Sequence, residues 1–213
     1  MKILAVAAHP DDEILGIGGT LLKHINNGHD VYICIVTNTY SPNWTDKYRK
    51  TKIEEQQTVD KIMNVKKRFN LDFPTVKLNT IPHGELNNAI SEVVNEVKPN
   101  IIYTHFEHDI NYDHKLVFRA VMVATRPPKK IKVICYETLS ETEWGTKSFK
   151  PNYWVEIDQY IKKKVSLFNI YASEVKKYPH PRSLEGLKVL AQKRGNEICS
   201  KYAEAFLIIR DTW

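Results

Sequence analysis

Short apolar runs rich in β-branched residues alternate along this chain with longer segments of helical spacing, and this alternation constrains the fold strongly. The runs predict strands at residues 2–8, 31–37, 75–81, 100–105, 131–136, 153–157 and 205–210. The spacing predicts helices at residues 14–27, 46–69, 86–97, 113–125, 159–172 and 183–203. Strands that alternate with helices of this length form parallel sheets covered on both faces. The predicted fold is therefore α/β, a single Rossmann-like three-layer domain over residues 1–213 with a mostly parallel sheet flanked by helices.

The composition permits a full hydrophobic core. Hydrophobic residues make up 42% and charged residues 26% of the 213 residues, which excludes a wholly disordered protein. The apolar start is too short for a signal peptide, and no apolar run approaches the roughly 20 residues of a membrane-spanning helix. The 3 cysteines form no CxxC pair, which favours reduced thiols over a disulfide. We therefore expect no transmembrane segment and a cytoplasmic location.

Basic residues exceed acidic residues by 31 to 25, which gives a formal net charge of +6. The excess is spread over several short lysine and arginine runs, as is usual for a solvated surface, and it is also compatible with an anionic substrate. No DNA- or RNA-binding motif accompanies these runs, so we expect no nucleic-acid partner. The sequence leaves a monomer and a homo-oligomer both open.

The segment His9-Pro10-Asp11-Asp12-Glu13 joins the first predicted strand to the first predicted helix. An imidazole and several carboxylates so close together are costly to bury without partners. A helix cap explains one or two of the acids, because Asp11 or Asp12 can accept hydrogen bonds from the first turn. It does not explain a histidine beside paired aspartates at the carboxyl end of a parallel strand, where ligands bind in such sheets.

A second polar cluster, HFEHDINYDH at residues 105–114, follows the fourth predicted strand. Because parallel strands end at the same edge of a sheet, we expect the two clusters to meet there. A catalytic zinc site needs three nitrogen or oxygen ligands and one open position for water. We predict His9, Asp12 and His114 as these ligands, with Asp11 free beside them to accept a proton. The same ligands accept Fe²⁺ or another divalent ion.

With these motifs the chain resembles the zinc-dependent LmbE/PIG-L family of de-N-acetylases. The resemblance rests on AHPDDE after the first strand, on DINYDH ending at residue 114 and on YAEAF near the C-terminus. It implies a zinc-dependent N-deacetylase that hydrolyses the linear amide C–N bond of an N-acetylglucosamine-type sugar. It also implies His9, Asp12 and His114 as ligands and Asp11 as general base. The partner implied is a small N-acetylated amino sugar, glycosidic, nucleotide-linked or lipid-linked; a non-catalytic metal- or nucleic-acid-binding module is the alternative.

One position departs from the family pattern. Several members carry a histidine three residues before the last ligand, which is credited with protonating the leaving amine or stabilising the oxyanion, and this chain has Asn111 there. Asn111 is predicted to bind substrate, since an amide can donate a hydrogen bond. Asp113 is predicted as a catalytic residue that orients a neighbour, and it can equally cap the following helix. The general acid stays open among Asp11, His105, His108 and His180.

The loop YPHPRS at residues 178–183 adds two predicted substrate-binding residues. Arg182 can hold a phosphate or carboxylate through two hydrogen bonds, and His180 can reach the site. The alternative is a stiff, proline-rich entry to a helix that Ser183 caps. Trp44 lies in another polar segment, where its ring can stack on a sugar or pack half-buried.

The segment Gly16-Ile17-Gly18-Gly19 does not fit a dinucleotide site. Its spacing differs from GxGxxG, and the glycines fall inside a predicted helix rather than in the turn before it. We expect these glycines to allow close packing of the helix on the sheet.

Overall fold

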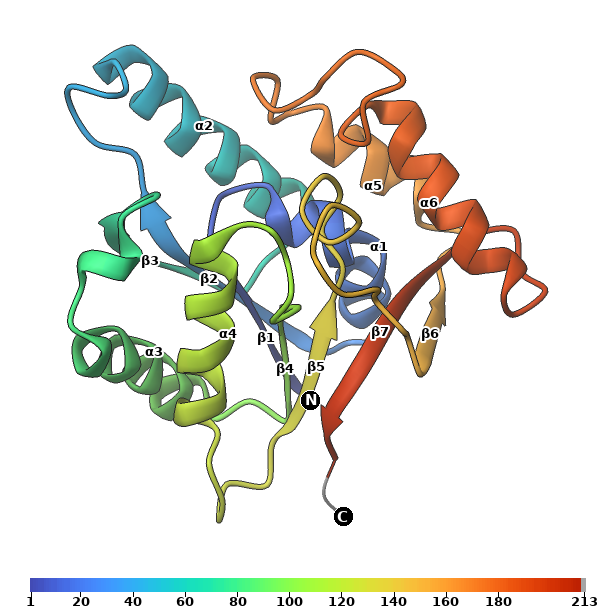
Figure 1. The fold of residues 1–213 in the computed structure, drawn as a ribbon. Helices are drawn as coiled ribbons and strands as arrows, with labels where there is room; N and C mark the ends of the chain where they lie inside the picture. Colours follow the sequence, from blue (N-terminus) through green and yellow to red (C-terminus); the bar gives the residue numbers. More distant parts are fainter. Residues whose placement is uncertain (212–213) are drawn as a thin grey trace.

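The computed structural model describes residues 1–211 and contains a seven-stranded sheet with helices on both faces (Figure 1). The strands are β1 (Lys2–Ala7), β2 (Asp30–Asn38), β3 (Lys67–Pro74), β4 (Ile101–His105), β5 (Lys132–Tyr136), β6 (Tyr153–Glu156) and β7 (Ala203–Arg210). The helices are α1 (Asp12–Asn26), α2 (Asp46–Met63), α3 (His83–Val97), α4 (Tyr112–Ala124), α5 (Ile161–Phe168) and α6 (Leu184–Asn196), with a short 3-10 helix at Leu78–Thr80. None of the described helices has the length and apolar character needed to cross a membrane.

The sheet has the strand order β3-β2-β1-β4-β5-β7-β6, which confirms the mostly parallel α/β fold. All neighbours from β3 to β5 pair in parallel. β7 is antiparallel to β5 and β6. The chain winds outward from β1 in one direction through β2 and β3, and then from β4 in the other. In open parallel sheets such a reversal leaves a ligand-binding crevice at the carboxyl ends of the two central strands.

Two hydrophobic cores, one on each face of the sheet, produce the three layers. Helices α1, α2, α5 and α6 pack on one face with Ile3 and Phe168, and α3 and α4 pack on the other with Leu4 and Val121 (Figure 1). Adjacent residues of a strand point to opposite faces, so Ile3 and Leu4 belong to different cores. All residues of β1 from Ile3 to Ala7 are fully buried, as expected for a central parallel strand.

The second helix and third strand differ from the sequence-based prediction. α2 ends at Met63, and the predicted end of this helix, near residue 69, lies instead in β3. Asn64 ends α2 in a left-handed conformation (φ 63°, ψ 48°), which asparagine adopts more readily than most residues. β3 is an edge strand in which Phe69, Leu71 and Phe73 alternate with polar residues and pack partly buried against the core, so no continuous apolar run reveals it. The strand predicted at 75–81 is wrong, because the 3-10 helix lies there, and α5 and α6 are shorter than predicted.

Two glycines of α1 allow the helix to lie close to its neighbours. A Cβ atom on Gly16 would come within 2.3 Å of Tyr136 Cδ2 in β5, and one on Gly19 within 2.8 Å of Ile157 Cγ2. The expectation that glycines here serve close packing is confirmed at these two positions. Gly18 has more space, because its nearest contacts would be side-chain atoms at 3.3 Å.

We predict that Gly16→Ala lowers the free energy of unfolding by about 1–3 kcal/mol, because the added methyl group must displace the buried Tyr136 ring. Gly18→Ala is the matched control in the same helix, where a helix propensity gain of about 1 kcal/mol offsets the tighter contact. Urea denaturation of both variants measures the difference. Equal stability of the two variants would contradict this account of the helix packing.

Candidate metal centre

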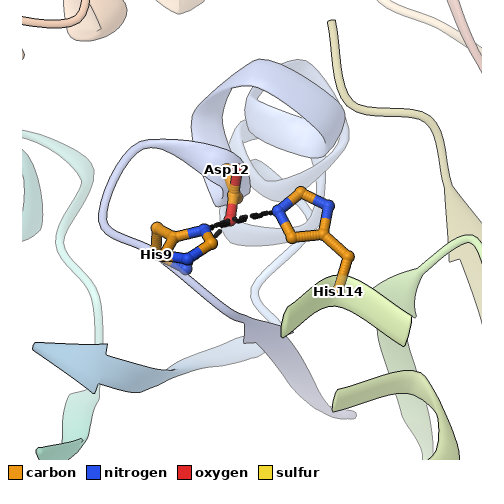
Figure 2. Close-up of side chains that lie close together, drawn as sticks. All are labelled: His9, Asp12 and His114. Carbon is orange, nitrogen blue, oxygen red and sulfur yellow. Dashed lines mark hydrogen bonds and ion pairs between the residues drawn. The ribbon is translucent and has the colours of Figure 1, made fainter. Parts of the chain in front are cut away.

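Three side chains from two distant segments converge at the carboxyl ends of β1 and β4 (Figure 2). Asp12 Oδ2 lies 3.2 Å from His9 Nδ1 and 3.3 Å from His114 Nε2. The two histidine nitrogens, His9 Nδ1 and His114 Nε2, lie 3.3 Å apart. Asp12 and His114 are fully buried, whereas His9 is partly exposed. The structure therefore brings together the three residues that the sequence predicts as ligands.

The spacing of these three atoms fits one tetrahedral metal ion. Ligand atoms about 2.0–2.1 Å from zinc stand at the corners of a tetrahedron with edges of about 3.3–3.4 Å. The observed separations of 3.2, 3.3 and 3.3 Å match those edges. Asp12 Oδ1 is buried and has no hydrogen-bond partner in the described part of the chain. Buried polar atoms normally have a partner, so this oxygen is left for a ligand such as a metal ion. Two imidazoles and a carboxylate suit zinc, iron and other divalent transition metals.

Two further carboxylates orient the histidines. Asp109 Oδ2 lies 2.9 Å from His114 Nδ1, so this nitrogen donates a hydrogen bond and Nε2 faces the centre. Asp113 Oδ2 lies 3.2 Å from His9 Nε2 and accepts a hydrogen bond from the Val76 backbone N–H at 2.7 Å. Carboxylates in these positions fix the tautomer of a metal-binding histidine and make it a stronger ligand. Asp113 thus contacts a neighbour that it can orient, and its catalytic role stays a prediction.

Asp12 favours the protonated form of both imidazoles, and the imidazoles favour its ionised form, whereas His114 opposes protonation of His9. Burial alone would raise the pKa of Asp12, but His114 and His9 outweigh it and hold this pKa well below its usual range. Burial alone would lower the pKa of both histidines, but their carboxylate neighbours raise that of His9 to about 9 and that of His114 to about 10. A metal ion therefore has to displace protons from these imidazoles, which makes metal binding weaker at low pH.

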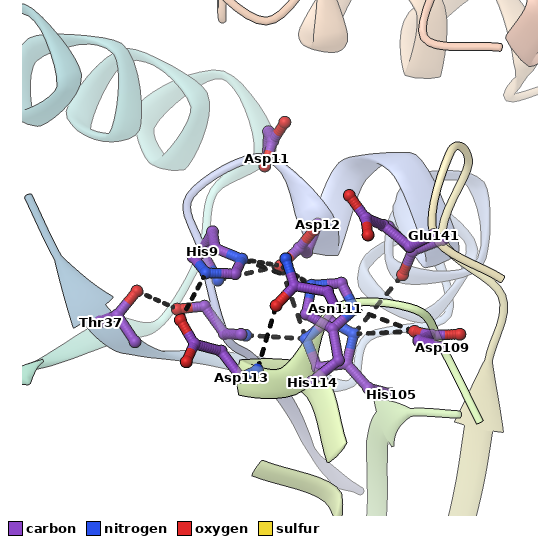
Figure 3. Close-up of polar contacts among 12 residues, drawn as sticks. His9, Asp11, Asp12, Thr37, His105, Asp109, Asn111, Asp113, His114 and Glu141 are labelled. Carbon is purple, nitrogen blue, oxygen red and sulfur yellow. Dashed lines mark hydrogen bonds and ion pairs between the residues drawn. The ribbon is translucent and has the colours of Figure 1, made fainter. Parts of the chain in front are cut away.

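A neighbouring group, His105 with Asp109 and His114, is also compact enough for an ion, but His105 is already engaged. His105, labelled in Figure 3, accepts the Ala8 backbone N–H through Nε2 at 2.8 Å. The same nitrogen lies 3.3 Å from the Tyr136 hydroxyl. Burial holds the pKa of His105 well below its usual value, so the ring is neutral. With Nε2 committed and the ring fully buried, His105 supports the fold and is unsuited to be the general acid.

Asp11 stands apart from the three ligands although it precedes Asp12 in the sequence (Figure 3). Its backbone has φ 114° and ψ −31°, a conformation that non-glycine residues rarely adopt and that clusters at functional sites. Its side chain makes no hydrogen bond to the first turn of α1, a turn that the structure describes in full. The helix-cap alternative therefore does not hold for Asp11, whose side chain lines a cleft beside the centre.

Glu13 holds the turn that carries Asp11. Glu13 is fully buried, and its Oε2 accepts the Asp11 backbone N–H at 3.0 Å. Its Oε1 accepts hydrogen bonds from the Tyr171 hydroxyl at 2.7 Å and from Arg68 Nη2 at 3.1 Å. The third acid of the motif thus stabilises the strained backbone rather than taking part in the centre.

A cleft of about 260 Å³ lies over the centre and includes His9, Asp11 and Asn111 in its wall. Asn111 Oδ1 accepts the Asp113 backbone N–H at 3.0 Å, so the amide N–H₂ group is left to donate to a ligand. Trp44, for which the sequence left stacking on a sugar and half-buried packing both open, is half-buried and also lines the cleft. Four polar wall residues lie outside the motifs that the sequence analysis singled out, two of them in α2 and two in loops: Tyr48, Lys52, Glu141 and Glu174.

The two residues predicted from the 178–183 loop have different positions. Arg182 lines the cleft, where Nη1 lies 3.4 Å from Asp11 Oδ2 and Nη2 lies 3.0 Å from Glu141 Oε1. Burial raises the pKa of Asp11 well above its usual value, and the Arg182 guanidinium opposes part of that rise. His180 is not among the described residues that line the cleft, and it packs edge-on against Trp144 with ring centroids 5.6 Å apart.

Comparison with known proteins finds a de-N-acetylase family, a deacetylase relative and structural neighbours of more than one activity. A family model described as PIG-L, GlcNAc-PI de-N-acetylase, matches residues 4–125. The uncharacterized deacetylase YaiS of Escherichia coli K12 is 34% identical over 146 residues, which span 65% of this chain and 74% of that protein. The fold resembles N,N'-diacetylchitobiose deacetylase from Pyrococcus horikoshii, with a TM-score of 0.79 at 19% identity over 98% of this chain and 83% of that one. It also resembles the 4-carboxy-2-hydroxymuconate hydratase GalB from Pseudomonas putida, with a TM-score of 0.78 at 18% identity over 100% and 97%.

We predict that His9→Ala abolishes stoichiometric zinc binding, because it removes one of three ligand atoms. Asp109→Asn should weaken zinc affinity by about 10–100-fold, since it loses the carboxylate that orients His114. His83→Ala, at an exposed histidine that begins α3, is the control and should bind zinc like the wild type. Zinc per chain after dialysis, and competition with a chromophoric chelator, measure these effects. Full zinc occupancy in a folded His9→Ala variant would exclude His9 as a ligand.

Proposed function

Because the chain belongs to the PIG-L (GlcNAc-PI de-N-acetylase) family, we propose that it is a metal-dependent hydrolase that removes the acetyl group from an N-acetylglucosamine-type sugar. The observation that carries this proposal is the convergence of His9, Asp12 and His114, with Asp11 beside them in the wall of a cleft. We assign the whole chain, residues 1–213, to this one deacetylase domain. We retain from the sequence a cytoplasmic location and the absence of a nucleic-acid partner as predictions.

His9, Asp12 and His114 would hold the metal ion, which is zinc or another divalent ion such as Fe²⁺. When bound, such an ion supplies Lewis acidity, because it polarises a carbonyl group and makes water more acidic. Three protein ligands leave one position of a tetrahedron for the reactants, whereas structural zinc sites use four protein ligands. This donor count favours an enzyme over a non-catalytic metal-binding module.

Asp11 is the proposed general base. Its carboxylate accepts a proton from the attacking water as the water oxygen bonds to the acetyl carbon. Its burial favours the protonated form, so Asp11 can hold this proton and return it to the leaving nitrogen. The amide C–N bond then breaks, and the products are acetate and a free amino sugar. In this scheme one carboxyl group serves as base and then as acid, and no histidine is required at position 111.

Asn111 and Asp113 have supporting roles in this proposal. The Asn111 amide N–H₂ group donates to the acetyl carbonyl oxygen, and its carbonyl oxygen is fixed by the Asp113 backbone N–H. Asp113 holds the imidazole of His9 through Nε2, so that Nδ1 stays directed at the centre. Asn111 caps the N-terminus of α4 and Asp113 lies in its first turn, and the same helix carries His114.

We predict that Asp11→Asn lowers kcat by about 10²–10⁴-fold while zinc stoichiometry stays at the wild-type value, because Asn cannot accept the proton. Asp30→Asn, at an exposed aspartate that begins β2, is the matched control and should leave kcat unchanged. Acetate release from methyl N-acetylglucosaminide measures kcat. A zinc-replete Asp11→Asn enzyme with wild-type turnover would rule out Asp11 as the base.

Removal of the metal is expected to abolish acetate release and leave the fold intact, because both hydrophobic cores lie within the layers and do not include the three ligands. Treatment with a chelator followed by dialysis tests this, with circular dichroism to follow the fold. Zinc or Fe²⁺ added back should restore acetate release. Undiminished turnover by the metal-free protein would refute the metal-dependent proposal.

A further inference from the structure

The cationic groups in the cleft are already matched by carboxylates. Arg182, which with Lys52 supplies the basic side chains other than His9 in the described part of the wall, lies 3.0 Å from Glu141 and 3.4 Å from Asp11. Arg182 Nη1 also lies 3.8 Å from Glu174 Oε2, and its Nε donates to Ser140 Oγ at 2.8 Å. The guanidinium that the sequence suggested as a clamp for phosphate is therefore held by groups of the protein.

Lys52, the other cation of the cleft wall, is matched in the same way. Its Nζ lies 2.9 Å from Glu174 Oε1 and 3.0 Å from Glu55 Oε2. Lys52 and Glu55 are both buried, and the Tyr48 hydroxyl donates to Glu174 Oε1 at 2.9 Å. These contacts join α2 to the loop that follows α5 and fix Lys52 beside its carboxylates.

Negative charge exceeds positive charge around the cleft, although the whole chain has a formal net charge of +6. Lys52 and Arg182 face Glu141 and Glu174 in the cleft wall, and Lys52 also contacts Glu55, which is buried outside the wall. With Glu55 included, the carboxylates outnumber these two cations even before Asp11 is counted. The proposed metal ion does not reverse this balance, because three more carboxylates surround its position: Asp12, Asp109 and Asp113.

On the basis of the proposed deacetylase function, we infer that the cleft takes N-acetylamino sugars with an uncharged carrier and discriminates against sugars that bear a phosphate or carboxylate. A cleft of about 260 Å³ is small for a ligand site, so a group attached directly to the sugar lies close to Glu141 and Glu174. An anionic group there meets like charges and finds no unmatched cation among the described residues of the wall. The amino sugar product carries a positive charge at neutral pH, which the same carboxylates favour.

This inference narrows the substrate classes that the sequence left open. Neutral glycosides of N-acetylglucosamine fit the charge of the cleft. Sugars linked through phosphate to a nucleotide or lipid carry their negative charge next to the ring, where the repulsion is strongest.

Binding of two deacetylated sugars to the zinc-loaded protein tests the inference without turnover. Methyl glucosaminide and glucosamine 1-phosphate share the ring and the amine and differ in the anionic group. Calorimetry should show about tenfold tighter binding of methyl glucosaminide at low salt, and the difference should shrink as salt screens the repulsion. Equal or tighter binding of glucosamine 1-phosphate would overturn the inference.

A pair of variants tests whether Glu141 causes the difference in affinity between the two sugars. Glu141→Gln removes a carboxylate that faces Arg182, so the tenfold difference between the two sugars should fall to about threefold. Glu96→Gln, at an exposed glutamate of α3, is the matched control and should keep the wild-type difference. The same affinity difference in both variants would show that Glu141 does not cause the repulsion. If Glu141→Gln does not fold, the salt dependence of binding to the wild-type protein still tests the charge preference.

Acetate release separates this inference from the proposed function. Methyl N-acetylglucosaminide and N-acetylglucosamine 1-phosphate are the acetylated counterparts of the two sugars. Failure to release acetate from either would count against the proposed function, while the calorimetry would still decide the charge preference. Faster release from the phosphate would leave the deacetylase function in place and overturn the inference.

Discussion

Parallel pairing of β1 with β4 is the constraint on which the metal centre depends. Leu4 pairs with Ile102 and Ala5 with Tyr103, so the two strands end at the same edge of the sheet. From this central pair the chain adds strands on opposite sides, β2 beside β1 and β5 beside β4. The connections therefore diverge at the carboxyl ends of β1 and β4 and leave room for the polar segments that follow each strand. His9 and His114, 105 positions apart in the sequence, are thereby brought to within 3.3 Å through their ring nitrogens.

The charged groups at this edge are held by a dense set of hydrogen bonds, because a buried carboxylate without partners would be too costly to keep ionised. Asp109 accepts from Thr142 at 2.6 Å and from His114 at 2.9 Å, and Glu13 accepts from Tyr171 at 2.7 Å. These bonds determine where each acid points. The His9 backbone N–H donates to Asp12 Oδ2 at 2.9 Å, and the Asp11 backbone N–H donates to Glu13 Oε2 at 3.0 Å. The adjacent aspartates therefore take up different positions and different proposed roles.

The central strands and the polar segments of the metal centre were predictable from the sequence. The central strands are almost entirely buried, so they form continuous apolar runs in the sequence. The HPDDE and DINYDH motifs contain more ionisable groups than a loop without a function requires. β3 was missed because its apolar residues alternate with polar ones and form no continuous run. Glu141 and Glu174 were missed because each is a single acid in a loop, and only long-range packing brings them to Arg182. Likewise, the sequence does not show which histidine of the 105–114 cluster is buried: His105 is fully buried, whereas His108 is partly exposed.

Anomalous diffraction at the zinc edge from crystals grown with zinc tests the central claim most directly. The account predicts one strong peak in the anomalous map at about 2.0–2.2 Å from His9 Nδ1, Asp12 Oδ2 and His114 Nε2. It further predicts that Asp11 lies outside bonding distance of the ion. A peak bound to His105, or an ion seen only on surface histidines with the three-residue group empty, would contradict it.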